Sequence, residues 1–207
     1  MDKKALYSLS YGVFMLSTKS GDTVNGCITN TCIQVANSPT RIAISVINAN
    51  YTCELIKQSG VFAITLLDNT CNFYTIQHFG FQSGRNVNKF DGYAGCRRVA
   101  NGTMAVTAGT NAYVSAYVQQ QIDLGSHMLF IAQVTDGEIL NNVPSATYAY
   151  YFANIKPKPE AVGKTPEGKT VWRCKICGYE YVGEELPEDF ICPLCKHPAS
   201  DFEKMTL

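Results

Sequence analysis

Four cysteines near the end of the chain have the spacing of ligands for one metal ion. They form two CxxC pairs, Cys174 with Cys177 and Cys192 with Cys195, and 14 residues separate the pairs. Each pair places two thiolates on one tight turn, and two facing turns supply the four corners of a tetrahedron. This spacing fits either an iron centre or a structural zinc site. The other five cysteines lack it, and we interpret them as small buried hydrophobic residues.

Aromatic residues are concentrated around these cysteines. A module of about 40 residues has too small a core to fold unaided, so we expect metal binding to supply much of its folding free energy. An apolar shell over the sulfurs is also what a buried electron-transfer centre requires. The aromatic residues are Trp172, Tyr179, Tyr181, Phe190 and Phe202.

A linker separates this module from the rest of the chain. Residues 153–170 contain three prolines and two glycines and hardly any large apolar side chain, which is typical of an extended connection. We therefore predict an N-terminal domain over residues 1–152, a linker over 153–170 and a metal module over 171–207.

The composition limits the class of protein. The formal net charge is zero, so nothing in it favours nucleic acid or an anionic membrane as a partner. The sequence opens without an apolar stretch of signal-peptide length, and no later run approaches the roughly 18 apolar residues of a membrane span. We expect a soluble cytoplasmic protein whose nine cysteines are reduced thiols and metal ligands.

The N-terminal domain is predicted to be mainly β with short α-helices. Seven β-branched and aromatic runs alternate with turn signals, which indicates an antiparallel sheet closed into a barrel. Helices are expected over Thr52–Ser59, which ends before Gly60, and over Thr70–His78. The predicted strands are Tyr11–Thr18, Thr23–Cys32, Arg41–Ile47, Val61–Leu67, Ala112–Asp123, Leu129–Leu140 and Ala146–Phe152.

Several segments of this domain resemble, in order, the flavin-reductase-like family. They are residues 24–31 (VNGCITNT), 44–52 (ISVINANYT), 78–90 (HFGFQSGRNVNKF) and 124–127 (LGSH), and residues 148–151 (YAYY) close the domain in the same style. None is as specific as the cysteine pairs, but their order and spacing extend over most of the domain. The resemblance covers residues 5–152 and implies an FMN-binding split β-barrel.

The resemblance also implies which residues contact the flavin ring. Asn30 and its neighbours offer amide, hydroxyl and backbone groups from a strand, and these groups suit the polar edge of the ring. The contacts expected on this basis are Thr29, Asn30, Thr31, Cys32 and Asn48.

A second group of residues is expected at the flavin phosphate. Thr52 at a helix start supplies a hydroxyl and N–H groups, which form either an anion site or a plain N-cap. Ser83, Arg85 and Lys89 lie on a glycine-containing loop that either closes around the phosphate or forms a solvated face. The family pattern favours phosphate binding. Glu54 would repel a phosphate over the helix axis, so we expect the phosphate to lie to one side.

One histidine is predicted to be catalytic. The family has Gly-Asp-His where this chain has Gly125, Ser126 and His127. The resemblance places His127 beside the flavin and the nicotinamide; the alternative is a hydrogen-bonded structural histidine at a strand start. Ser126 removes a carboxylate that would favour the imidazolium, so direct oxidation of a nicotinamide remains open.

The C-terminal run RCKICGYEYVGEELPEDFICPLC resembles the short rubredoxin at the end of rubrerythrin-like proteins. This resemblance favours iron over zinc and implies one iron ion bound by all four cysteine thiolates. The whole chain resembles the high-molecular-weight rubredoxins of anaerobic bacteria. It implies an electron-transfer enzyme that takes electrons from NAD(P)H through FMN to the iron.

The same resemblance implies the partners. Electrons would pass on to a redox partner such as a flavodiiron oxygen or nitric oxide reductase, and the chain would form a homodimer. Residues 170–207 contain seven Asp or Glu and four Lys or Arg, which suits a small docking surface. Two alternatives are an electron carrier reduced by a separate reductase and an FMN-binding protein with a structural zinc ribbon.

Overall fold

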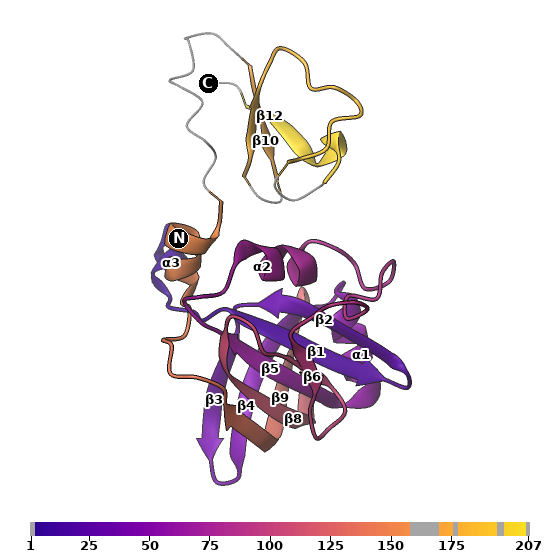
Figure 1. The fold of residues 1–207 in the computed structure, drawn as a ribbon, viewed down its shortest axis with the longest axis vertical. Helices are drawn as coiled ribbons and strands as arrows, with labels where there is room; N and C mark the ends of the chain where they lie inside the picture. Colours follow the sequence, from indigo (N-terminus) through magenta and orange to yellow (C-terminus); the bar gives the residue numbers. More distant parts are fainter. Residues whose placement is uncertain (1–2, 158–169, 176–177, 194–196, 206–207) are drawn as a thin grey trace. The chain divides into compact units, whose positions relative to one another are not determined.

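The computed structural model describes residues 3–157, 170–175, 178–193 and 197–205. The chain divides into two compact units, Met1–Ile155 and Lys156–Leu207 (Figure 1). Two of the predicted metal ligands, Cys177 and Cys195, lie outside the described residues. No helix in the described part of the chain is both long enough and apolar enough to cross a membrane.

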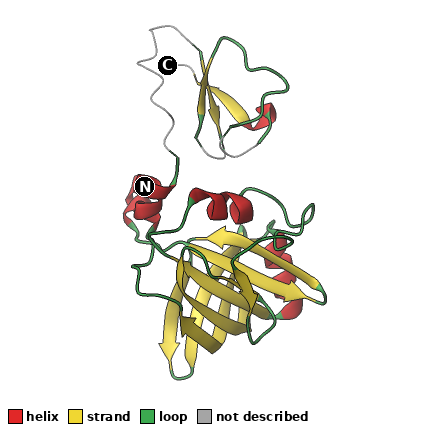
Figure 2. Cartoon of the chain, viewed as in Figure 1, coloured by secondary structure: helices red, strands yellow, loops and turns green. Residues whose placement is uncertain are grey.

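The first unit is built on one seven-stranded antiparallel sheet that curls into a barrel (Figure 2). The strand order is β2-β1-β5-β8-β9-β4-β3, so three of the six neighbouring pairs along the sheet are not consecutive in the chain. The prediction of a mainly β fold with short helices is confirmed. The strands are β1 Phe14–Ser20, β2 Thr23–Thr29, β3 Cys32–Asn37, β4 Thr40–Ile47, β5 Val61–Leu67, β8 Thr110–Asp123 and β9 His127–Ile139.

The barrel is interrupted between β2 and β3, the two end strands of the sheet. Within the described residues no ladder of hydrogen bonds joins these strands, although only Asn30 and Thr31 separate them in the chain. The sequence predicted a single strand over Thr23–Cys32. The chain leaves the strand because the Thr31 N–H donates to Thr29 Oγ1 at 3.3 Å, a local bond that competes with the ladder.

Helix α1, Tyr51–Ser59, begins at an asparagine cap. The Asn50 side chain accepts from the Thr52 N–H, so the cap is Asn50 and not Thr52 as the sequence predicted. The helix ends at Gly60, whose φ of 69° is a left-handed conformation that glycine adopts without strain, and its N–H donates to the Ile56 carbonyl.

Helix α2, Phe73–Gly80, starts three residues later than predicted. Its cap is Asn72, whose side chain accepts from the Thr75 N–H at 3.1 Å. Both helices pack on the barrel through buried side chains, α1 through Cys53 and Ile56 and α2 through Ile76 and Phe79. The largest fully buried side chains of the unit are Phe62, Phe79, Phe130, Met15, Leu16, Ile44, Ile56, Ile64 and Leu67.

The seventh predicted strand, Ala146–Phe152, is wrong. This segment forms the short helix α3, Tyr148–Tyr150, followed by a π-helical turn over Tyr151–Ile155. The Thr147 hydroxyl oxygen accepts from the Tyr150 N–H at 3.0 Å and so caps the turn. The Tyr148 ring packs on the Phe152 ring, four residues on, at a centroid distance of 4.9 Å, a contact that helical spacing allows.

Two short strands, β6 Cys96–Arg98 and β7 Met104–Val106, were not predicted.

The second unit contains a three-stranded sheet in the order β11-β10-β12. Its strands are β10 Val171–Cys174, β11 Glu180–Val182 and β12 Phe202–Met205, and a 3₁₀ turn covers Ala199–Asp201. The ring of Phe190 packs on those of Tyr181 and Phe202 at centroid distances of 4.9 and 5.4 Å. The small core of this unit is therefore aromatic.

Candidate functional site

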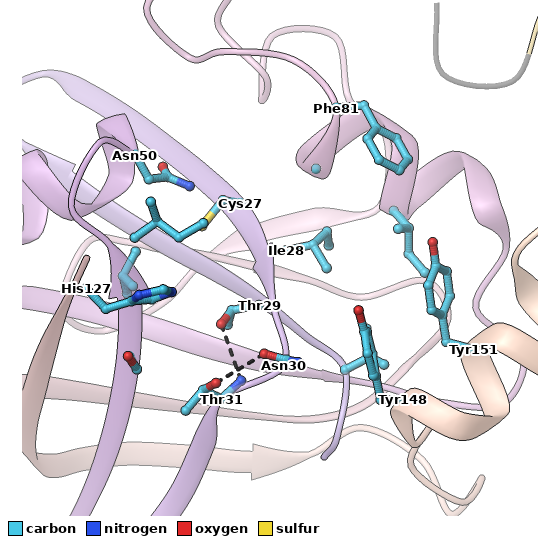
Figure 3. A pocket seen from close by; sticks show the side chains of 16 residues that line it. Cys27, Ile28, Thr29, Asn30, Thr31, Asn50, Phe81, His127, Tyr148 and Tyr151 are labelled. Carbon is cyan, nitrogen blue, oxygen red and sulfur yellow. Dashed lines mark hydrogen bonds between the residues drawn. The ribbon is translucent and has the colours of Figure 1, made fainter. Parts of the chain in front are cut away.

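A cavity of about 300 Å³ lies where the sheet is interrupted between β2 and β3 (Figure 3). Its walls come from the end of β2, the end of β4, the cap of α1, helix α2, the start of β9 and the segment around α3. The lining residues are Val13, Cys27, Ile28, Thr29, Asn30, Thr31, Ser45, Val46, Ile47, Asn50, Ile76, Gly80, Phe81, His127, Tyr148 and Tyr151.

The interruption orients the polar groups of three predicted flavin contacts. The Thr31 hydroxyl donates to Asn30 Oδ1 at 3.1 Å, while the Thr31 N–H is held by Thr29 Oγ1 (Figure 3). Because its oxygen is engaged, the Asn30 amide presents N–H groups, and these suit a carbonyl or an unprotonated ring nitrogen. The structure thus brings Thr29, Asn30 and Thr31 together in one wall of the cavity.

Cys32, which was also predicted to contact the flavin, does not line this cavity. It begins β3, pairs with Ile44 of β4 and packs against the barrel core. Burial raises the pKa of its thiol to about 12, so the thiol is protonated at neutral pH.

His127 lines the cavity at the start of β9, where it pairs with Ile47 of β4, and the serine before it holds its ring. The Ser126 Oγ lies 2.8 Å from His127 Nδ1. A hydrogen bond at Nδ1 fixes the orientation of the imidazole and leaves Nε2 as its second polar atom. Ser126 therefore takes the positioning place of the carboxylate that the family pattern has there.

The loop that carries His127 is braced by Asn48. The Asn48 side-chain amide donates to the Gly125 carbonyl at 2.8 Å and to Asp123 Oδ1 at 3.2 Å. The Gly125 N–H, followed by the Asn48 amide, lowers the pKa of the Asp123 carboxyl, so the carboxylate form is the one that stabilises this loop. Asn48, predicted to touch the flavin, is a brace for the histidine loop in this structure.

A buried polar cluster lies behind the Cys27 side of the cavity. Thr52 is fully buried, its N–H donates to Asn50 Oδ1 at 2.9 Å, and its hydroxyl oxygen accepts from Asn25 Nδ2 at 3.0 Å. Burial raises the pKa of the Cys27 thiol. The hydrogen bond of this thiol with Thr52 lowers the same pKa, by a smaller amount. The backbone N–H and the hydroxyl of Thr52 are thus both engaged within the protein.

The loop after α2 carries the other predicted phosphate residues. The Ser83 Oγ accepts from the Arg85 N–H at 3.2 Å. The Arg85 guanidinium pairs with Glu54 Oε2 at 2.6 Å and lies 4.6 Å from the centroid of the Tyr51 ring. Arg85 and Glu54 are half-exposed, so Arg85 meets the first turn of α1 at the surface.

Lys89, by contrast, is buried. Only 3% of it is exposed, and its ammonium donates to the carbonyls of Gly26 in β2 and Phe79 in α2, both at 2.8 Å. Burial lowers the pKa of this ammonium. The nearby Cys27 raises the same pKa, by a smaller amount. Lys89 thus links the strand and the helix that form two walls of the cavity.

Gly84 joins the loop to the buried cluster. A Cβ at this position would lie 2.0 Å from Asn25 Oδ1, so only glycine permits the approach that is observed. Asn25 Oδ1 is buried and has no hydrogen-bond partner among the described residues. The loop of Ser83 and Arg85 is therefore seated on the same cluster that backs the Cys27 wall of the cavity.

The second unit contains the two described cysteines of the predicted metal site. Cys174 and Cys192 are buried, with exposed fractions of 1% and 0%. The Cys174 carbonyl accepts from the Gly178 N–H at 2.9 Å, and the Cys192 N–H donates to the His197 carbonyl at 2.8 Å. Such turns hold thiolates in place, and the surrounding aromatic core excludes water. The two described cysteines thus have the burial and the backbone surroundings that a metal ligand requires.

No disulfide joins any of the seven cysteines in the described part of the chain.

Sequence reasoning did not assign several of the lining residues to the site. Asn50 carried a signal, because an asparagine directly before a helix is a typical cap. The tyrosines of the α3 segment belong to a run that the family resemblance includes, residues 148–151, but a strand was predicted there and no flavin contact was assigned to them. The unassigned residues include Cys27, Asn50, Phe81, Tyr148 and Tyr151.

Two domain families match the chain. Residues 6–158 match the flavin reductase like domain, and residues 172–203 match the rubrerythrin, rubredoxin-like domain. The high molecular weight rubredoxin of Moorella thermoacetica is 34% identical and covers 99% of this chain and 100% of its own length. The ferric-chelate reductase (NAD(P)H) of Archaeoglobus fulgidus is 33% identical and covers 83% of this chain and 98% of its own length.

Solved structures show the same fold at low identity. An NADH:FAD oxidoreductase from Streptomyces globisporus C-1027, in complex with NAD and FAD fragments, aligns with a TM-score of 0.62 and 18% identity. The alignment covers 70% of this chain and 84% of that one.

Proposed function

The chain belongs to the flavin reductase like domain family and ends in a rubredoxin-like domain, and from this we propose that it is an NAD(P)H-dependent oxidoreductase that passes electrons through FMN to a four-cysteine iron centre. The 33% identity with an NAD(P)H ferric-chelate reductase supports a nicotinamide donor. The observation that carries the proposal is the cavity at the interruption of the barrel, which is lined by both His127 and residues 29–31.

In this proposal the flavin ring occupies the cavity. Bound FMN would supply the exchange between a two-electron hydride donor and one-electron acceptors. The protein supplies the rest: the Asn30 amide and the Thr29 hydroxyl donate to the polar edge of the ring, while Thr31 donates to both of these side chains and so orients them. His127, held at Nδ1 by Ser126, offers Nε2 to the nicotinamide side. Phe81, Tyr148 and Tyr151 exclude water from the remaining walls.

The phosphate is assigned to the surface beside the first turn of α1. Arg85 is there with Ser83 on the same loop, and a guanidinium with donors on several edges can bind a phosphate without leaving Glu54. We assign Thr52 and Lys89 to the support of the walls, because their polar groups are engaged inside the protein. Asn48 is assigned to the histidine loop.

Iron would be held by Cys174, Cys177, Cys192 and Cys195. Support comes from the burial of the two described cysteines and from the rubredoxin-like match over residues 172–203. Thiolate iron accepts and releases single electrons at a potential set by hydrogen bonds and burial. We further propose that residues 1–152 form the flavin domain, residues 153–170 the linker and residues 171–207 the metal module.

The assembly and partners are also proposals. A homodimer is supported by exposed apolar side chains on the edge strand β3, where Ile33 is 62% exposed. The acidic excess of the C-terminal module suits docking to a redox partner such as a flavodiiron protein. We place the chain in the cytoplasm, where its cysteines would stay reduced.

Anaerobic mixing of the purified, FMN-loaded chain with NADH or NADPH tests the proposal. We expect flavin absorbance to fall within seconds and the ferric-thiolate bands to fall with it. In the control variant Cys174→Ser the flavin should still be reduced, while the iron bands are absent. Flavin that stays oxidised would favour a carrier served by another reductase, and stoichiometric zinc without iron bands would favour a structural ribbon.

A further inference from the structure

A second cavity, of about 760 Å³, adjoins the first in the same unit. It is lined by side chains from the N-terminal residues 6–11, from the interruption of the barrel and from the segment 147–152. Most of these residues do not line the first cavity. Its volume lies within the range of cavities that bind small molecules.

The two cavities share a wall. Asn30, Thr31 and Tyr148 line both of them. The Tyr148 ring is held edge-on by its neighbours, with the Tyr11 centroid at 6.4 Å and the Phe152 centroid at 4.9 Å. Only these shared side chains would therefore separate a molecule in the second cavity from a flavin ring in the first.

The lining selects against charged ligands. None of the residues that line the second cavity carries a formal charge. A phosphate or carboxylate placed there would lose hydration without gaining a cation, which is costly. The dinucleotide of a nicotinamide cofactor, with its pyrophosphate, is thus a poor occupant.

The lining favours a flat ring with carbonyl groups. Rings of Tyr11, Tyr148 and Phe152 offer faces and edges for aromatic packing. The hydroxyl groups of Ser10 and Thr147 and the amide N–H groups of Asn30 can donate to carbonyl oxygens.

We propose that the second cavity binds neutral quinones, and that such a quinone is a further electron acceptor of this chain. Its reduction rests on the proposed function. NAD(P)H supplies a hydride and solvent supplies a proton, and the two electrons and two protons convert both ring carbonyls to hydroxyls. The products are NAD(P)⁺ and the hydroquinone.

Equilibrium dialysis of the oxidised, FMN-loaded full chain with menadione tests binding without nicotinamide. The variant Ala149→Trp fills the second cavity from an exposed helical position that does not line the first. We expect it to raise the dissociation constant for menadione at least about tenfold and to leave FMN affinity unchanged. Ala100→Trp, at an exposed turn that lines neither cavity, should leave both unchanged.

A charge variant tests the selection for neutral ligands. The unmodified chain should bind menadione at least about tenfold more tightly than naphthoquinone sulfonate, and Leu9→Lys, which adds a cation to the lining, should narrow or reverse this preference.

Three results would overturn the proposal: no menadione binding, binding that is indifferent to Ala149→Trp, or displacement of menadione by NAD⁺, NADP⁺ or excess FMN. If binding persists but NAD(P)H does not reduce the flavin, the proposed function fails while the quinone site remains. If NAD(P)H reduces the flavin but menadione does not bind, only the quinone site fails.

Discussion

At the scale of residues, Ser126 gives His127 a hydrogen-bond partner although the family pattern has an aspartate at this position. The Ser126 Oγ lies 2.8 Å from His127 Nδ1, so the ring is held although the carboxylate of the family pattern is absent. A hydroxyl orients the imidazole without adding a negative charge. The sequence alone indicated the loss of the charge, and the structure adds the retained hydrogen bond.

Variants of Ser126 separate orientation from charge. Ser126→Ala should lower the rate of flavin reduction by NAD(P)H about tenfold, because the ring loses the group that positions it. Ser126→Asp should keep the rate of the unmodified chain, because the carboxylate also positions the ring. The plateau of the rate against pH should extend to higher pH, since a carboxylate stabilises the imidazolium. Stopped-flow rates across pH measure both, with FMN affinity as the control. If the pH profiles of Ser126→Asp and the unmodified chain coincide, charge at this position is irrelevant.

At the scale of elements, the interruption between β2 and β3 and the loop after α2 form the site together. The local bond of Thr29 to the Thr31 N–H ends the strand and opens the barrel wall. On the other side, Gly84 lies against Asn25, and this contact seats the loop of Ser83 and Arg85 on the cluster behind Cys27. The first feature is local in sequence, whereas the second joins residues that are far apart in the chain.

The contact between Gly84 and Asn25 can be measured by a double-mutant cycle. Gly84→Ala should cost about 1–3 kcal/mol of unfolding free energy, because its Cβ would overlap Asn25 Oδ1. It should also weaken FMN binding through displacement of the loop. In an Asn25→Ala background the same change should cost at least about 1 kcal/mol less. Denaturant unfolding and FMN titration give both quantities, and additive costs would show that the two residues do not act on each other.

At the scale of the whole molecule, the chain is two compact units with different sources of stability. The first has a barrel core of large apolar side chains, whereas the second has a three-stranded sheet and a few aromatic rings. The chain has one tryptophan, Trp172, and it lies in β10 of the second unit. Its fluorescence therefore reports on that unit alone.

Metal removal should unfold the second unit and spare the first. A cysteine-bound metal contributes on the order of 10 kcal/mol to such a module. A chelator under reducing conditions should shift Trp172 emission to longer wavelength, while the melting transition of the barrel, followed by far-ultraviolet circular dichroism, stays where it was. Cys174→Ser should reproduce the shift, and Cys96→Ser, a change outside this unit, should not. A barrel transition that moves with the metal would contradict the independence of the units.

The sequence by itself determined the fold class, the order of most strands and the family, because these depend on alternation, on turn residues and on motifs that are local in the chain. It also indicated Asn30 and His127, which line one cavity in the folded barrel. The tertiary structure decided what local patterns cannot encode. It shows that Lys89 is buried between a strand and a helix, that Asn48 braces a loop 75 residues away, and that the tyrosines around α3 separate two cavities. Each of these depends on hydrogen bonds or packing between segments distant in sequence, and no spacing along the chain specifies such contacts.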